Sequence, residues 1–307
     1  MTISPPLLRV DGLTKNFGDF RAVDGISFDV DRGQVVGLLG PNGAGKTTTI
    51  HMLLGLTSYD AGTVAYFGLD LQRNRTECLQ RINFTSSYNS LQGRITVEQN
   101  LRVFAGLYDV PNARKTISEL VDYFEIAELL HQEFWSLSAG QRTRVNLIKS
   151  LINSPELLLM DEPTASLDPD IADKTLSLIE EMRASRGLSI LYTSHNMAEV
   201  TRVCDNVVFL DHGRVVAHDT PSELTRRIPT AELRLVLADG VRPALLQWLA
   251  AAAFDARELG SHGVTLTVAD DAVAGTLTRI AAAGFALVDI EIRRPTLEDV
   301  FLQIARS

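Results

Sequence analysis

The hydrophobic and polar positions along the chain predict strands that alternate with helices. From residue 7 to residue 36 the pattern is strand-like, and three Asp-Gly or Asp-Arg-Gly turn signals interrupt it. Later apolar runs of strand length are separated by stretches with helical spacing. This alternation favours a largely parallel sheet covered on both faces, so the expected fold class is α/β. The later strands are expected at 61–68, 157–160, 189–193 and 207–210, and helices at 98–107, 112–130, from near Asp170 and from near Met197.

The pattern starts again after Arg226-Arg227-Ile228-Pro229, where the sequence becomes rich in alanine. Strands and helices then follow in the order β-α-β-β-α-β, which is typical of a small ferredoxin-like α+β domain. We therefore expect two domains, residues 1–227 and residues 228–307. The second is expected to hold strands at 232–237, 264–268 and 286–292, helices at 242–253 and 272–283, one further strand between the first helix and residue 264, and a final helix.

The composition is that of a soluble globular protein. Of 307 residues, 45% are hydrophobic and 22% charged, and the net charge of −9 argues against a broad nucleic-acid-binding face. Cys78 and Cys204 lie far apart, as expected for two reduced thiols in a cytosolic protein. The start lacks a signal-peptide pattern, and the most apolar later stretch, 245–254, is shorter than the roughly 18–20 residues that cross a bilayer. If this chain serves transport, the pore therefore belongs to another polypeptide.

Residues 40–48 fit the phosphate-binding pattern G-x-x-x-x-G-K-[ST] and lie between a predicted buried strand and a predicted helix. Glycines let successive backbone N–H groups point at one centre, and the helix adds the positive end of its dipole. Lys46 is expected to reach the β- and γ-phosphates, and the Thr47 hydroxyl to ligate Mg²⁺. The alternative is a glycine-rich turn with a chance lysine. The expected phosphate contacts are Gly40, Pro41, Asn42, Gly43, Ala44, Gly45, Lys46, Thr47 and Thr48.

A second anion site is predicted at Leu137-Ser138-Ala139-Gly140-Gln141, which precedes a helical run at 142–152. Together with the phosphate loop, this segment resembles the signature of the nucleotide-binding subunits of ATP-binding cassette (ABC) transporters. That family usually has glycine where this chain has Ala139. The resemblance implies that Ser138, Ala139, Gly140 and Gln141 complete the ATP site of a second subunit. Without a ligand, the same residues would be an ordinary capped helix.

Two polar strand ends predict the hydrolytic groups. The apolar run 157–160 ends in Asp161-Glu162, at the strand end where α/β sheets bind ligands. The resemblance implies that Asp161 holds Mg²⁺ through water and that Glu162 orients and deprotonates the attacking water. It also assigns His195, at the end of another apolar run, to the γ-phosphate. The alternatives are an acidic helix cap and an ordinary core or surface histidine.

Three further positions follow from the resemblance. Phe17 corresponds to the aromatic residue that stacks on adenine, and Phe20 is a weaker candidate. Where the family has a glutamine that contacts Mg²⁺ and the attacking water, alignment places Ser87. Serine is shorter, so contact would need a bridging water or a displaced loop. Gln92 lies nearby in sequence, but its spacing does not fit.

The resemblance implies a P-loop NTPase fold with a mostly parallel core, an antiparallel β subdomain and a helical subdomain at about 82–152. It implies an ATPase that uses ATP and Mg²⁺ and closes as a dimer, with a second copy of itself or a homologous subunit. The partner would be a membrane permease docked on about 86–110, which places the chain at the cytoplasmic face of the cell membrane. Residues 295–302 resemble the C-terminal end of drug-resistance and ABC-2-type exporter subunits, in which a small C-terminal domain supports assembly. The alternatives are a soluble ABC protein acting on ribosomes or DNA, and a low-turnover nucleotide-binding regulator.

Overall fold

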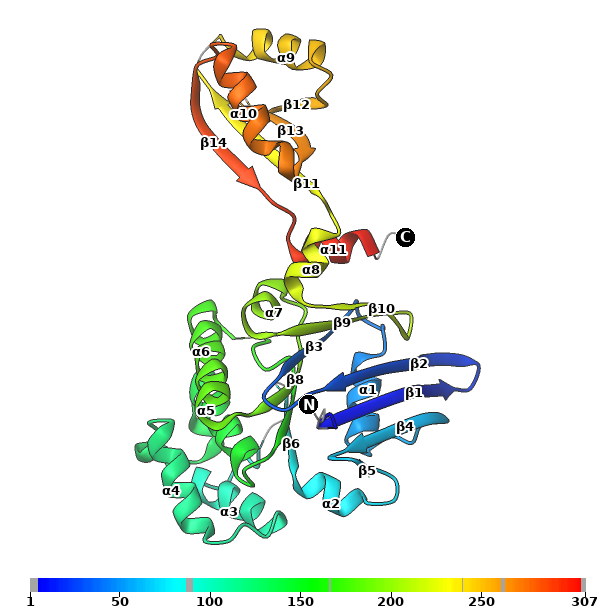
Figure 1. Cartoon of the computed structure of the whole chain (residues 1–307). Helices are drawn as coiled ribbons and strands as arrows, with labels where there is room; N and C mark the ends of the chain where they lie inside the picture. Colours follow the sequence, from blue (N-terminus) through cyan, green and yellow to red (C-terminus); the bar gives the residue numbers. More distant parts are fainter. Residues whose placement is uncertain (1–4, 87–90, 166, 239, 261–262, 305–307) are drawn as a thin grey trace. The chain divides into compact units, whose positions relative to one another are not determined.

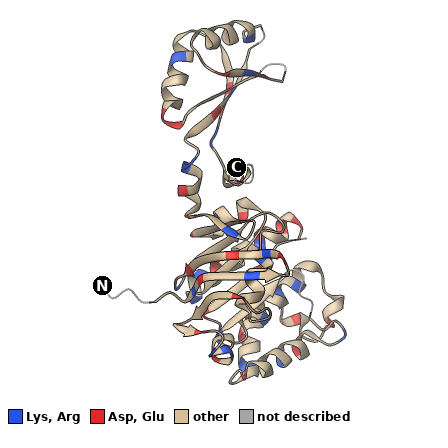
Figure 2. Ribbon diagram, turned by 90° about the vertical axis from the view of Figure 1, so that its right-hand side faces the viewer, with Lys and Arg blue, Asp and Glu red and all other residues tan. Residues whose placement is uncertain are grey.

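The protein divides into two compact units, one ending at Pro221 and the other beginning at Ser222. A computed structural model describes residues 5–86, 91–165, 167–238, 240–260 and 263–304 (Figure 1). The division falls a few residues before the boundary expected between residues 227 and 228. Figure 2 shows acidic and basic residues interspersed along the described ribbon of both units. Among the described residues, no helix is both long enough and apolar enough to cross a membrane.

The core of the first unit is a six-stranded sheet in the order β10-β9-β3-β8-β7-β6. All neighbouring pairs are parallel except β10 with β9, which confirms the largely parallel sheet predicted from the alternation of strands and helices. Every residue of β3 and β8 is buried, as expected for strands covered on both faces. The strands are β3 (Val35–Leu39), β6 (Ile82–Ser86), β7 (Leu157–Asp161), β8 (Ser189–Thr193), β9 (Asn206–Asp211) and β10 (Arg214–Asp219).

A second, antiparallel sheet has the order β2-β1-β4-β5. Helix α1 (Lys46–Leu53) contributes Ile50, Met52 and Leu53 to a hydrophobic core that also contains residues of both sheets. Because this core fixes α1, it also fixes the loop that leads into the helix. The strands are β1 (Leu8–Phe17), β2 (Phe20–Val30), β4 (Ala61–Tyr66) and β5 (Leu69–Asp70).

The remaining helices of the first unit include a helical segment between β6 and β7. The predicted helix 112–130 is shorter than expected, because α4 ends at Tyr123 and Glu125 has a left-handed backbone with φ +53°. Its apolar spacing continued because Phe124, Ile126 and Leu129 are buried beyond the helix end. The helices are α2 (Arg75–Gln80), α3 (Val97–Leu107), α4 (Ala113–Tyr123), α5 (Ala139–Leu151), α6 (Pro169–Arg186), α7 (Met197–Val203) and the short 3-10 turns Ala127–Leu129 and Phe134–Ser136; α8 (Pro221–Arg226) begins at the division between the units.

The second unit has the predicted β-α-β-β-α-β order, and its antiparallel sheet runs β12-β13-β11-β14. This strand order is that of a ferredoxin-like domain, which confirms the prediction. Leu233, Leu235 and Leu266 of the sheet pack with Leu245 and Ile280 of the helices. The elements are β11 (Thr230–Leu237), α9 (Arg242–Ala251), β12 (Ala256–Leu259), β13 (Gly263–Ala269), a 3-10 turn (Asp270–Ala272), α10 (Val273–Ala282), β14 (Leu287–Arg293) and α11 (Leu297–Ile304).

Candidate functional site

The loop between β3 and α1 has the backbone of an anion cradle. Gly40, Gly43 and Gly45 have φ values of +150°, +83° and +103°, which favour glycine. A methyl group on Gly45 would lie 2.6 Å from the carbonyl oxygen of Ala22, and one on Gly40 would overlap the carbonyl oxygen of Leu210. The loop is therefore held between β2 of the antiparallel sheet and β9 of the core sheet.

Lys46 begins α1 and is only 8% exposed. Its ammonium group donates hydrogen bonds to the carbonyl oxygens of Gly40 (2.6 Å) and Pro41 (3.1 Å). Burial lowers the pKa of Lys46, and the nearby carboxylates of Glu162 and Asp161 partly offset this shift. The site thus holds a buried cation at a helix N-terminus, a place that suits a phosphate group.

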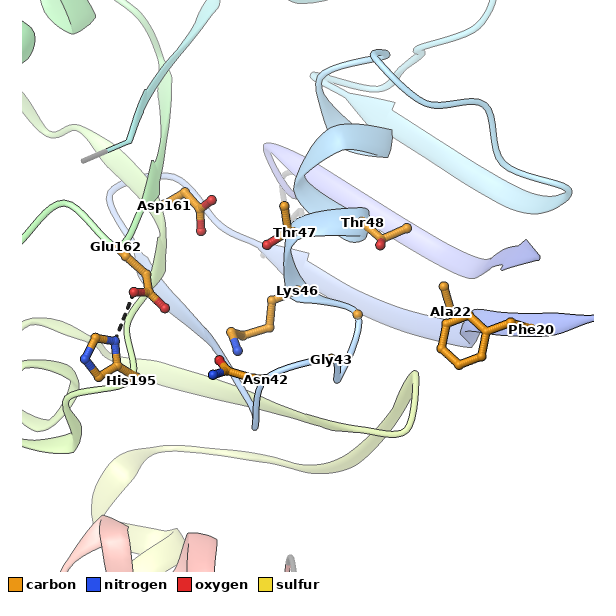
Figure 3. Close-up of a pocket in the computed structure, with 11 residues that line it drawn as sticks. Phe20, Ala22, Asn42, Gly43, Lys46, Thr47, Thr48, Asp161, Glu162 and His195 are labelled. Atoms are coloured by element: carbon orange, nitrogen blue, oxygen red, sulfur yellow. Dashed lines mark hydrogen bonds and ion pairs between the residues drawn. The ribbon is translucent and has the colours of Figure 1, made fainter. Parts of the chain in front are cut away.

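A cavity of about 600 Å³ opens beside this loop. Figure 3 shows side chains from four places in the sequence converging on it: the β2 strand, the phosphate loop with α1, the end of β7, and the end of β8. The lining residues are Phe20, Ala22, Asn42, Gly43, Gly45, Lys46, Thr47, Thr48, Asp161, Glu162 and His195. The structure therefore brings together most of the residues predicted for phosphate, Mg²⁺ and hydrolysis.

The aromatic residue on this cavity is Phe20, the weaker of the two predicted candidates; Phe17 is not among the lining residues. The two face each other across the β1–β2 hairpin, and Phe20 shares its face of β2 with Ala22, which also lines the cavity. Phe17 lies on the adjacent strand β1, with the Lys15 ammonium 5.3 Å from its ring centroid. Of the two predicted aromatic residues, Phe20 is therefore the one placed to contact a ligand in the cavity.

Thr193, which is not among the predicted site residues, ties the end of β7 to the end of β8. Its hydroxyl donates to Asp161 (2.6 Å) and accepts from the backbone N–H of Glu162 (3.0 Å). Glu162 has φ +48°, a conformation that is uncommon outside glycine and persists where surrounding contacts enforce it. In the sequence, the three consecutive hydroxyl side chains Tyr192-Thr193-Ser194 at the end of an apolar run were the feature that could have indicated this role.

Glu162 and His195 meet at the edge of the cavity. His195 Nδ1 lies 2.9 Å from Glu162 Oε2, and the histidine side chain is 68% exposed whereas the glutamate side chain is 18% exposed. The pair places a carboxylate that can accept a proton beside an imidazole that can hold a ligand or orient that carboxylate.

The predicted signature residues are not brought to this cavity. Ser138 caps α5 and forms a reciprocal capping box with Gln141, at 3.3 Å and 2.9 Å. Ser138 and Ala139 are exposed, Gly140 is partly exposed, and none lines the pocket. The helix terminus thus presents free N–H groups outward, where another molecule could use them.

The prediction for Ser87 lies outside the described residues. Gln92 is exposed and does not line the cavity; its backbone exchanges hydrogen bonds with the Asn100 side chain.

The oxygen atoms at the cavity suit Mg²⁺ that is shared with bound phosphates, and not a metal ion held entirely by protein side chains. Thr47 and Asp161 supply oxygen atoms, and Thr193 orients the Asp161 carboxylate. No group of three or more His, Cys, Asp or Glu side chains in the described part of the chain could hold a metal ion. Mg²⁺ is commonly bound through one or two protein oxygens, with phosphate oxygens and water completing its shell.

Comparison with known proteins extends over both units. A family model described as ABC transporter matches residues 23–165. The chain is 36% identical to Nod factor export ATP-binding protein I of Ralstonia nicotianae over 98% of this chain and 94% of that protein. It is 34% identical to daunorubicin resistance ATP-binding protein DrrA3 of Streptomyces coeruleorubidus over 97% and 95%. Among solved structures, cbiO1 from Clostridium perfringens aligns with a TM-score of 0.66 at 26% identity, covering 81% of this chain and 98% of that one.

Proposed function

The chain belongs to the ABC transporter family, and from that membership we propose that it is the ATP-hydrolysing subunit of an exporter that powers a separate membrane permease. The observation that carries this proposal is the convergence of Lys46, Asp161, Glu162 and His195 on one cavity. Relatives that match over nearly the whole chain are named for Nod factor export and daunorubicin resistance. These names favour export over the ribosome- or DNA-acting alternative.

ATP binds with its phosphates on residues 40–48. The backbone N–H groups of the loop and the start of α1 face the anionic oxygens, and Lys46 neutralises the β- and γ-phosphates. Thr47 and Asp161 hold Mg²⁺, which when bound neutralises charge that develops on the phosphates. The exposed ring of Phe20 receives the adenine base.

Hydrolysis uses Glu162 as the base. Its carboxylate accepts a proton from a water molecule whose oxygen attacks the γ-phosphorus, and the bond between that phosphorus and the β–γ bridging oxygen breaks. ADP and inorganic phosphate are the products. His195, 2.9 Å from Glu162, orients the carboxylate and contacts the γ-phosphate. Lys46 remains the counter-charge for the leaving phosphate groups.

The complete site is shared between two subunits. The exposed α5 terminus, with Ser138, Ala139, Gly140 and Gln141, lies outside the cavity of its own chain and closes over the γ-phosphate in a second copy or a homologous subunit. ATP then joins the two subunits, and hydrolysis lets them separate.

The permease docks on the helical segment near residues 86–110. In this segment α3 exposes Val103 (54%) and Leu107 (66%), two apolar side chains that a partner can cover. The docked chain lies at the cytoplasmic face of the membrane, and the second unit supports assembly of the subunits. The permease selects the cargo.

The test is ATP-dependent dimerisation of the full chain carrying Glu162→Gln, which binds ATP but lacks the base. Light scattering after size exclusion should show a dimer with ATP and Mg²⁺ and a monomer without nucleotide. Lys46→Ala in the same background is the control, because it weakens phosphate binding and should stay monomeric. A Glu162→Gln monomer in saturating ATP would contradict the shared site.

A further inference from the structure

Glu199, in the first turn of α7, is a buried carboxylate that accepts hydrogen bonds from two segments: the loop after β7 and the stretch from β8 to the start of α7. It is 8% exposed. Its Oε2 accepts from the hydroxyls of Thr164 (2.7 Å), Tyr192 (2.9 Å) and Ser194 (2.9 Å), and its Oε1 accepts from Asn196 Nδ2 (3.3 Å). In the part of the chain that the structure describes, no lysine, arginine or histidine forms an ion pair with it. Its negative charge is therefore stabilised by neutral donors that must point toward it.

These donors belong to the two segments that carry the hydrolytic pair. Thr164 follows Glu162 by two residues, and Ser194 directly precedes His195. Alternate residues of a strand face opposite sides, so Thr193 turns its hydroxyl to the Glu162 backbone whereas Ser194 turns its hydroxyl to Glu199. One carboxylate thus joins the loop after β7 to the end of β8.

The chemistry of the donors supports a fixed arrangement. Burial and the nearby Glu199 carboxylate raise the pKa of Tyr192, so its phenol stays protonated and keeps donating. The hydroxyls of Thr164, Tyr192 and Ser194 and the amide group of Asn196 all donate to this one carboxylate. Because buried polar networks rigidify a site when every member is satisfied, Glu199 restricts both attached segments.

Glu199 acts from behind the nucleotide cavity. It does not line that cavity, but it lines a second one of about 480 Å³ that shares Glu162 and His195 with the first. Arg202 also lines the second cavity, yet it pairs with Asp173 and Glu180 of α6.

We propose that Glu199 is a positioning residue for ATP hydrolysis, which holds the loop of Glu162 and the strand end of His195 in the arrangement that keeps these two side chains 2.9 Å apart. The proposal rests on the proposed function, since it assigns Glu199 to the same reaction. Loss of this anchor lets the base and the histidine move apart without removing any group that binds ATP. A displacement of about 1 Å in a reacting group can cost about a hundredfold in rate.

The experiment compares Glu199→Ala and Glu199→Gln with the parent in the full chain, by steady-state ATP hydrolysis and by equilibrium binding of ATP. Glu199→Ala should lower kcat by about 10- to 100-fold and leave KM and the Kd for ATP within about twofold. Glu199→Gln keeps one acceptor oxygen, so its kcat should lie between those of the parent and Glu199→Ala. Tyr192→Phe removes one donor and should lower kcat by a smaller factor, which tests the network if the alanine variant does not fold.

Glu156→Gln is the matched control. Glu156 is also a carboxylate with several hydrogen bonds, although only partly buried; its partners are Arg32 and Arg81, and it lines neither cavity. The Glu156→Gln variant should have a lower melting temperature than the parent but the same kcat. If Glu156→Gln and Glu199→Gln lower kcat equally, general loss of stability explains the effect and the proposal is wrong.

A double variant separates positioning from structure. In a Glu162→Gln background the base is absent, so Glu199→Ala should cause little further loss of kcat. An equal loss in both backgrounds, or a raised KM with unchanged kcat, would overturn the proposal. If Glu162→Gln itself leaves hydrolysis unchanged, the proposed function fails. If Glu162→Gln lowers kcat to a small residual rate and Glu199→Ala in the parent chain does not lower kcat, only the role of Glu199 fails.

Discussion

The position of Phe20 on the nucleotide cavity predicts that this residue, and not Phe17, stacks on the adenine base of ATP. Both side chains lie on the same face of the β1–β2 hairpin, but only Phe20 lines the cavity. Phe20→Ala should therefore weaken ATP binding, and Phe17→Ala is the matched control because it removes the same ring one strand away.

The structure sets the size of the effect. Phe20 is 64% exposed, so its ring has a free face for a base, and its truncation removes little packing within the protein. Stacking of one base on an aromatic ring contributes about 1–3 kcal/mol, which corresponds to about a 5- to 160-fold rise in Kd. Phe17→Ala should change the Kd for ATP less than about twofold, and the melting temperatures of both variants should stay close to that of the parent.

Equilibrium titration with ATP and with inorganic tripolyphosphate gives the decisive comparison. Phe20→Ala should weaken ATP binding but leave tripolyphosphate binding unchanged, because tripolyphosphate has no base to stack. Phe20→Trp should restore the affinity for ATP. An equal or larger effect of Phe17→Ala on ATP binding would refute the assignment, as would a parallel loss of tripolyphosphate affinity in Phe20→Ala.

Three further predictions concern the phosphate loop, the partly buried Lys149, and Ser87, which aligns with the family's glutamine. Gly40→Ala should lower the free energy of unfolding by about 1–3 kcal/mol more than Gly43→Ala in urea titrations, because both have positive φ but only the first overlaps the Leu210 carbonyl; equal losses would contradict this. Burial lowers the pKa of Lys149 to about 8, below its unfolded value, so between these values the unfolded chain binds more protons and this group adds stability as pH rises. Between pH 7.5 and pH 9.5, the unfolding free energy of the parent should therefore increase by about 1–2 kcal/mol more than that of a Lys149→Met variant. Equal changes in the two proteins would disprove this prediction. Ser87→Gln should raise the ATPase rate or its stimulation by the permease, and unchanged kinetics with the permease present would argue against the serine as a slowing feature.

Local patterns were sufficient for most of the fold. The apolar runs 157–160 and 189–193 predicted strands because a strand buried on both faces needs continuous apolar residues. In the structure they form the neighbouring parallel strands β7 and β8. The helix predicted at 112–130 was too long because burial, and not helix geometry, continued its apolar spacing beyond Tyr123. Periodicity identifies which residues are buried, but it does not show where a backbone leaves the helical conformation.

The site was predictable where chemistry is local and less so where it depends on distant contacts. The phosphate loop and the Asp161-Glu162 strand end lie in continuous motifs, and the structure brings both to the cavity. The choice between Phe17 and Phe20 depends on which strand of a hairpin faces the loop, which spacing alone does not determine. The contact of Thr164 with Glu199 joins residues 35 positions apart and has no local pattern.

The wedged position of the phosphate loop links ligand binding to mechanics. Gly45 leaves no room for a methyl group against Ala22 of one sheet, Gly40 leaves none against Leu210 of the other, and the backbone of Gly213 bonds to both Ala44 and Asp24. A rotation of either sheet would therefore change the curvature of the cradle. Since coupling free energies are reciprocal, a nucleotide that prefers one curvature must also bias the angle between the sheets. The loop therefore couples phosphate binding to the angle between the two sheets.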